Sequence, residues 1–262
     1  MVTCKLQGGL GNQMFQIAAT YALSLRYSGE YFVNLKDCYT PNQGNVSSNY
    51  KNNIFSKVND YEDTERYPIY HEPNFSYGEL PWNKKLLLIG SFQSEKYFID
   101  YKKEILDLFE IPNDLKQDVF NYLNKIGVNP DRKLTSIHIR RGDYLKFSGF
   151  HTPCSIEYYN EAISIIKNHE DSDFVFISDD IEWVKENFKG DGYFYSELNN
   201  DILDLTLQTI CDNNIIANSS FSWWGAWLNQ SQNKKVIAPK QWFGPSGHKD
   251  TQDIIPNNWI KC

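Results

Sequence analysis

The sequence predicts an α/β fold whose sheets are made of parallel strands. In the second half, short apolar stretches alternate with segments of helical spacing, which is the pattern of a wound α/β sheet. At the N-terminus a short apolar stretch, a glycine turn and a helical segment follow in the same order. With 262 residues, 41% of them apolar, the chain is long enough for one large domain or two modest ones.

The N-terminal half begins with this strand, turn and helix. Alanine and leucine recur at helical spacing after the glycines, and a later apolar stretch from Leu86 is typical of a buried strand. Between them lies a polar stretch rich in Asn, Tyr and Pro, which indicates loops and short helices. We expect strands at 1–6, 31–35 and 86–91, helices at 14–26 and 100–120, and irregular structure over 36–82.

The C-terminal half is more regular. The turn Asn129-Pro130-Asp131 separates a long helical segment from the first strand of this half, so we place a domain boundary near residue 130, between domains 1–130 and 131–262. We expect strands at 134–139, 174–178, 214–217 and 236–238, and helices at 155–168, from about 180, at 201–211 and at 222–230.

Charge and cysteine usage narrow the function classes. The net charge of -7 argues against broad capture of nucleic acid or anionic membranes, so any anion must bind locally. Five scattered cysteines without a C-x-x-C pair indicate free thiols in a reducing compartment. We therefore expect a cytoplasmic protein, and a soluble one because no apolar run is long enough to cross a bilayer. The 15% of aromatic residues suits sugar binding, but aromatic side chains fill cores equally well.

Two adjacent arginines stand at the end of a predicted strand. In the stretch 137–144, IHIRRGDY, the strand ends in Arg140 and Arg141 and is followed by a glycine turn with Asp143. Ligands of open α/β sheets lie outside the carboxyl ends of the strands. Guanidinium groups there can hold a pyrophosphate and stabilise the charge of a departing nucleoside diphosphate in place of a metal. An isolated Arg-Arg pair is more often a surface feature, but the strand end and the flanking His138 and Asp143 favour a site.

Two further loops are predicted to reach the same edge. The strand 174–178 ends in Asp179 and Asp180; one carboxylate can accept bonds from a guanine edge or a ribose hydroxyl, and the other is expected to cap the next helix. The stretch 218–227, NSSFSWWGAW, opens a helix whose N-terminus is suited to an anion. Its serines can equally be ordinary caps, and its tryptophans can be core.

Nucleotide and metal motifs of other classes are incomplete. The glycine turn 7–13 lacks the third glycine of a dinucleotide fingerprint, and no G-K-[ST] follows it. A close backbone approach to a ligand and a tight structural turn both remain open for it. The letters of an Asp-x-Asp metal element occur at 171–173, but they precede their strand, and the five histidines have no ligand spacing. We therefore expect no metal requirement, and of the histidines only His138 is a site candidate.

Taken together, four stretches resemble glycosyltransferase family 11. They are 7–16 (QGGLGNQMFQ), the H-x-R-R-G-D stretch, 176–180 and 219–228, in matching order from end to end of the chain. Members of that family are α-1,2-fucosyltransferases, which move L-fucose from GDP-β-L-fucose to the 2-hydroxyl of a galactose with inversion and without a metal. The resemblance implies a GT-B-like architecture of two facing Rossmann-like domains, the C-terminal one mainly for GDP-fucose and the N-terminal one mainly for the acceptor.

The same resemblance implies roles for individual residues. Arg140 and Arg141 would bind the pyrophosphate, while Asp143 and His138 would shape the site. The inverting reaction also needs a base, and Asp143, His138 and an oxygen of the departing phosphate all remain open for this. The donor-binding residues implied are Arg140, Arg141, Asp179, Ser219, Ser220 and Phe221, with Gly9, Asn12 and Gln13 facing the donor or the acceptor. The alternatives are a carbohydrate-binding protein without catalysis and a GT-B transferase for another sugar nucleotide.

Overall fold

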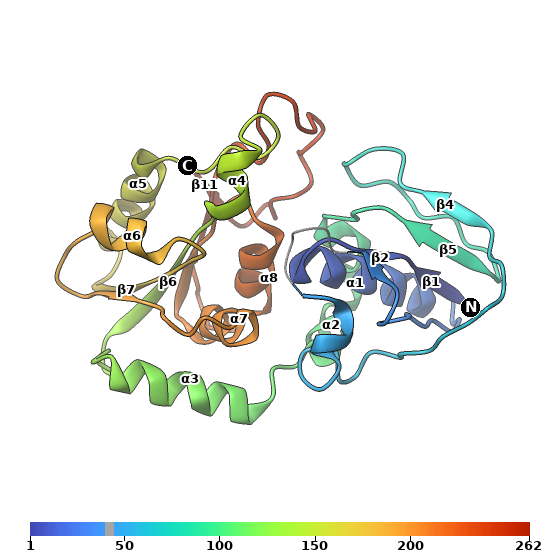
Figure 1. Cartoon of the computed structure of the whole chain (residues 1–262), viewed down its shortest axis with the longest axis horizontal. Helices are drawn as coiled ribbons and strands as arrows, with labels where there is room; N and C mark the ends of the chain where they lie inside the picture. The colour runs from blue at the N-terminus through green and yellow to red at the C-terminus, as the bar shows by residue number, and fades with distance from the viewer. Residues whose placement is uncertain (40–44) are drawn as a thin grey trace. The chain divides into compact units, whose positions relative to one another are not determined.

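The computed structural model describes residues 1–39 and 45–262, which form two compact units (Figure 1). Unit 1 comprises Met1–Glu110 and His248–Pro256, and unit 2 comprises Ile111–Gly247 and Asn257–Cys262. Each unit contains helices and parallel strands, so the predicted α/β class with parallel sheets is confirmed.

Unit 1 is built around one long helix and two small parallel sheets. The helix α1 (Leu10–Arg26) is apolar around most of its circumference and is largely buried, as expected of a helix at the centre of its unit. One sheet has the strand order β1-β5-β4, and the other pairs β2 with β3. The strands are β1 (Val2–Cys4), β2 (Leu6–Gln7), β3 (Cys38–Tyr39), β4 (Ile69–His71) and β5 (Leu86–Ile89); the shorter helices are η1 (Ser47–Tyr50), η2 (Glu95–Tyr97), η3 (Ile99–Tyr101) and α2 (Lys102–Leu108).

Unit 2 carries a six-stranded parallel sheet in the order β11-β10-β9-β6-β7-β8. Its strands are β6 (Lys133–Ile139), β7 (Ser172–Ser178), β8 (Tyr193–Tyr195), β9 (Asn213–Ile215), β10 (Val236–Ala238) and β11 (Ile260–Lys261). Its helices are α3 (Asn113–Lys125), α4 (Gly142–Lys146), α5 (Ile156–Lys167), α6 (Ile181–Asn187), α7 (Asp201–Ile210) and α8 (Ser220–Leu228).

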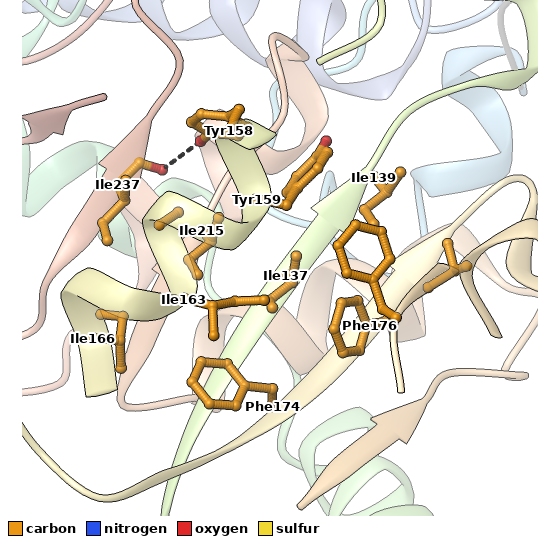
Figure 2. Packing of buried hydrophobic residues seen from close by; sticks show 13 residues of the cluster. Ile137, Ile139, Tyr158, Tyr159, Ile163, Ile166, Phe174, Phe176, Ile215 and Ile237 are labelled. Atoms are coloured by element: carbon orange, nitrogen blue, oxygen red, sulfur yellow. Dashed lines mark hydrogen bonds between the residues drawn. The ribbon is translucent and has the colours of Figure 1, made fainter. Parts of the chain in front are cut away.

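The central strands of unit 2 are covered on both faces. Along β7, Phe174 and Phe176 pack into a cluster with α5 and β6, whereas Val175 and Ile177 pack into a second cluster with α3 and α7. Figure 2 shows the first cluster, in which aromatic rings of β7 lie beside isoleucines of β6 and α5. Burial on both faces explains why the middle of β7, residues 174–177, is a continuous apolar run. It also holds the ends of β6 and β7, from which the candidate site extends, in a fixed position.

The division between the units differs from the predicted boundary near residue 130. It falls after Glu110, because the expected helix 100–120 is interrupted by Pro112, which disfavours helical geometry in the residue before it. The second part of that helix, α3, belongs to unit 2, where Val119 packs in the cluster with α7.

Other differences from the predicted elements are small. The helix predicted from residue 14 begins at Leu10, and the strand predicted at 31–35 is reduced to isolated bridges at Tyr31 and Val33. The short strands β3, β4, β8 and β11 and the helix α4 were not predicted. The other strands and helices of the second half lie within a few residues of their predicted positions. Part of the predicted irregular stretch 36–82, residues 40–44, lies outside the described residues.

Candidate active site

Two loops meet at the carboxyl edge of the unit 2 sheet because β6 and β7 are paired in register. His138 lies opposite Ile177, and Ile139 lies opposite Ser178, so the residues that follow each strand are neighbours. This is the edge at which open α/β sheets bind ligands. The predicted convergence of these two loops is therefore observed.

Arg140 is held between two carboxylates. Its Nη2 lies 2.6 Å from Oδ1 of Asp143, one turn further along, and its Nη1 lies 3.0 Å from Oδ2 of Asp179. Its guanidinium also lies 5.6 Å from the centre of the Tyr144 ring. These two ion pairs fix the guanidinium in position. Because the side chain keeps 29% of its exposure, the group is still open to a ligand.

Arg141 turns instead toward α6. Its Nε donates to Oδ2 of Asp180 at 2.9 Å, and its guanidinium lies 3.6 Å from the centre of the Trp183 ring. Asp180 occupies the N-cap position of α6, but its side chain makes no capping hydrogen bond. The expectation that one of the two aspartates caps this helix through its side chain is therefore wrong for Asp180, whose carboxylate is bound to Arg141 instead.

Asp179 joins the two loops. Its Oδ1 accepts a hydrogen bond from the backbone N–H of Arg141 at 2.9 Å, while its Oδ2 faces Arg140. The close approach requires glycine at position 142, since a Cβ there would lie 2.6 Å from Oδ2 of Asp179. Asp179 thus contacts the backbone and one side chain of the Arg-Arg-Gly turn at once.

His138 is buried beneath this turn. His138 is a residue of β6, and its ring centre lies 5.4 Å from that of Phe221. Its Nδ1 has no hydrogen-bond partner among the described residues. Burial lowers the pKa of His138 to about 4; the nearby carboxylate of Asp179 opposes this shift and the charge of Arg140 adds to it. The imidazole is therefore neutral at pH 7.

The third predicted loop leads into α8. Ser219 is its N-cap residue and makes no side-chain capping bond, and Ser220 and Phe221 form the start of the helix. The Tyr144 hydroxyl donates to the carbonyl oxygen of Asn218 at 2.9 Å, so α4 is bound directly to this loop. Together with the contact between Phe221 and His138, this bond brings the third loop to the same edge.

The charges at this edge determine which groups can bind an anion. Two guanidinium groups lie among three carboxylates, those of Asp143, Asp179 and Asp180, so the two arginines do not give a net positive charge. The described contacts of Arg140 use only Nη1 and Nη2, although a guanidinium has five N–H donors. The first N–H groups of α8 also have no acceptor within the helix. An anion at this edge therefore has two sets of donors.

The predicted N-terminal residues belong to unit 1. Gly9 is the N-cap residue of α1, and Asn12 accepts a hydrogen bond from Nε2 of Gln93 at 2.8 Å. Gln13 is fully buried and donates to the carbonyl oxygen of Gly8 at 2.8 Å. Gly8 itself has a φ of +78°, which favours glycine. In the observed geometry this segment is a tight turn, and a ligand role for it remains a prediction.

The Asp-x-Asp letters lie at the opposite edge of the sheet, as predicted. Asp171 and Asp173 both contact Arg132, at 2.7 and 2.8 Å. Within residues 1–39 and 45–262, no group of three or more His, Cys, Asp or Glu side chains is arranged to hold a metal ion. None of the helices in those ranges combines the length and apolar character needed to span a membrane.

Solved structures of low sequence identity share this fold. The chain matches an apo-form crystal structure of POFUT1 with a TM-score of 0.53 and 10% identity, covering 90% of this chain and 96% of that one. It matches the NodZ α-1,6-fucosyltransferase soaked with GDP-fucose with a TM-score of 0.50 and 8% identity, covering 87% and 92%. Fold and site together define an α/β protein of GT-B fold with an arginine–carboxylate cluster at the strand ends of its second unit.

The chain belongs to glycosyl transferase family 11, whose family profile matches residues 1–262. It is thus a glycosyltransferase. The O-antigen biosynthesis glycosyltransferase WbnK of Escherichia coli is 34% identical to it over 99% of both chains. An alpha-1,2-colitosyltransferase of Escherichia coli is 30% identical, over 100% of this chain and 98% of that protein. The galactoside alpha-(1,2)-fucosyltransferase 1 of Leontopithecus chrysomelas is 30% identical over 55% of this chain and 43% of its own length.

Proposed function

We propose that this chain moves L-fucose from GDP-β-L-fucose to the 2-hydroxyl of a galactose residue in a glycan, with inversion. The family supports a glycosyl transfer, and the names of two relatives specify a 1,2 linkage. One of those names also specifies a galactoside acceptor and a fucosyl group. The fold match to a fucosyltransferase soaked with GDP-fucose agrees with this donor class.

The observation that carries the proposal is the position of Arg140. The end of β6 presents its guanidinium, and the contacts to Asp143 and Asp179 fix its direction. As the glycosidic bond breaks, the leaving GDP gains negative charge, and a cation already in place stabilises that charge without rearranging. The remaining donors of Arg140 and the N-terminus of α8 would share the diphosphate oxygens.

This assignment gives the two units different substrates. Unit 2 binds GDP-fucose, because the arginines and the N-terminus of α8 belong to it. Unit 1 binds mainly the acceptor, with the turn of Gly9, Asn12 and Gln13 contributing to donor or acceptor binding. Ser219, Ser220 and Phe221 line the donor pocket.

The reaction needs no metal in this proposal, because guanidinium groups take the position of the cation. The proton of the attacking hydroxyl goes to Asp143 or to an oxygen of the departing phosphate. His138 is the weakest of the three candidate bases, since its buried side chain leaves little surface for contact with an acceptor hydroxyl. We place His138 beneath the site, as a residue that shapes it.

One experiment tests the whole assignment. The full chain is incubated with GDP-fucose and a panel of galactose-terminated acceptors in the presence of EDTA, and the linkage of any product is determined. An α-1,2-linked fucose on galactose supports the proposal. A product with another linkage, or activity that disappears with EDTA and returns with a divalent metal, contradicts it.

A second donor is supported by one relative, the alpha-1,2-colitosyltransferase that aligns with the whole chain. L-Colitose is L-fucose without its 3-hydroxyl, so GDP-colitose presents the same diphosphate to Arg140. Parallel assays with the two donors separate the candidates through kcat/KM. A site that hydrogen-bonds the 3-hydroxyl discriminates strongly against the sugar that lacks it.

We also propose that the protein works in the cytoplasm. The five cysteines are free thiols, two of them buried at Cys4 and Cys211. Burial raises the pKa of Cys4 to about 12, so its thiol stays protonated and unreactive. Such thiols are usual in a reducing compartment.

A further inference from the structure

Unit 1 has a pocket at the carboxyl ends of two parallel strands. Its volume is about 580 Å³, within the range of small-molecule sites. Glu72 directly follows β4 and Ser91 follows β5 after one glycine, so the pocket lies at the ligand-binding edge of this sheet. The segment beginning at His248, which comes from the far end of the chain but belongs to unit 1, completes the wall.

The two sides of the pocket are joined by Asp250. Its Oδ2 accepts hydrogen bonds from the backbone N–H groups of Phe75, at 2.7 Å, and Ser76, at 3.1 Å. Although burial acts in the opposite direction, the bond from Ser76 and other backbone bonds keep the pKa of Asp250 below its usual value. A second carboxylate, of Asp253, accepts from the N–H of Tyr77 at 3.0 Å. The pocket wall is therefore built by specific bonds between distant segments.

Glu72 lines the pocket and holds a strained turn in place. Its carboxylate accepts bonds from the N–H groups of Ser91, at 2.6 Å, and Phe92, at 3.0 Å, and from the Tyr97 hydroxyl at 3.2 Å. Phe92 is fully buried at a φ of +49°, a conformation that costs a residue with a large side chain free energy. Such strain persists only where surrounding contacts enforce it, and it is concentrated at functional sites.

The lining fits a neutral sugar better than an anion. The ring of His248 is stacked on that of Phe75, with centres 4.5 Å apart and planes 20° apart, which gives a flat wall for the apolar face of a pyranose. Asn74 and Ser91 supply an amide and a hydroxyl beside it. Two carboxylates and no lysine or arginine line the described part of the pocket, so it repels a diphosphate and accepts hydroxyl donors.

We propose that this pocket binds the galactose residue of the acceptor, with His248 against the sugar ring and Asn74 and Ser91 bonded to its hydroxyl groups. The proposal rests on the proposed function for the identity of the sugar. It gives the carboxyl edge of unit 1 the neutral substrate and leaves the charged donor to unit 2. It also gives a function to the segment His248–Pro256, which belongs to unit 1 although it is near the C-terminal end of the sequence.

The test measures acceptor binding in the full chain, apart from catalysis. N-acetyllactosamine and methyl β-D-galactopyranoside are titrated by ligand-observed NMR with GDP at saturation. His248→Ala and Asn74→Ala should each weaken binding about tenfold, while the affinity for GDP is unchanged. His169→Ala, an exposed histidine of unit 2, is the matched control and should bind as the wild type does.

The outcomes separate the pocket from the proposed reaction. If the wild type binds neither galactoside, or if both pocket variants bind as well as the wild type, the pocket assignment is wrong whatever the enzyme transfers. If the wild type and variants behave as expected but GDP-fucose yields no fucosylated product, the pocket stands and the proposed donor fails. Both pocket positions are exposed, so their truncation leaves the clamps of Glu72 and Asp250 intact.

Discussion

Oδ2 of Asp179 lies 3.0 Å from Nη1 of Arg140, and its other oxygen accepts the backbone N–H of Arg141. One carboxylate at the end of β7 thereby fixes both the turn after β6 and the side chain that this turn presents. Since the two strands are paired in register, the position of Arg140 depends on the sheet itself and not on a flexible loop. Preorganised charge of this kind makes the largest single contribution to the rate enhancement of many enzymes.

Replacing Arg140 by Ala should lower kcat about a hundredfold to a thousandfold, as expected for the loss of one transition-state donor. Arg140→Lys should recover only part of this, because an ammonium keeps the charge but not the planar fork. Initial rates at saturating GDP-fucose provide the measurement. Arg132→Ala is the matched control at the opposite edge of the same sheet, where Arg132 contacts Asp171 and Asp173. Equal rates for the Arg140 and Arg132 variants would remove the catalytic role.

Asp179→Asn tests whether this carboxylate positions Arg140. The amide oxygen can still accept the N–H of Arg141, but the ion pair with Arg140 is lost, so we expect kcat to fall about tenfold, equivalent to about 1.4 kcal/mol. Thermal unfolding should change little. Steady-state kinetics that show only a raised KM for GDP-fucose, with kcat intact, would instead favour direct binding of the donor by Asp179.

Much of this site was predictable because strand ends are visible in the sequence. The apolar run before Arg140 and the one before Asp179 indicate two parallel strands, and parallel strands deliver their next residues to one edge. The partners of the arginines were not predictable, since Trp183 and Asp180 approach Arg141 only through the pairing of β6 with β7.

The unit 1 pocket was beyond sequence reasoning for a similar reason. Its walls come from segments near residues 75 and 250, and only the folded chain brings them together. The unit boundary was misplaced because the helical spacing continues across Pro112, while the packing of α3 against α7 assigns that helix to unit 2. Pattern alone does not show which sheet a helix covers.

Trp183 should contribute to the site through Arg141. Its ring centre lies 3.6 Å from the guanidinium, and a cation–π contact of this kind is worth roughly 0.5–2 kcal/mol. Trp183→Leu should therefore weaken GDP binding severalfold, whereas Trp183→Phe should retain most of the affinity. Calorimetric titration of GDP into the two variants, and into each combined with Arg141→Ala, isolates the coupling. Additive losses in that cycle would show that the ring acts only through packing.

The burial of His138 predicts how stability depends on pH. Burial, opposed by Asp179 and assisted by Arg140, lowers the pKa of His138 to about 4 from an ordinary value of 6.5. Between these values the unfolded chain binds a proton that the folded chain does not, so the stabilisation is complete above pH 6.5 and is lost as the pH falls through 4. One such proton changes the free energy of unfolding by about 1.4 kcal/mol per pH unit.

His138→Gln should make the slope of unfolding free energy against pH shallower by up to this amount between pH 4 and 6.5, measured by urea denaturation. The wild-type chain, measured in parallel, is the reference, and an identical slope for the His138→Gln variant would mean that the His138 imidazole is protonated as easily in the folded chain as in the unfolded one.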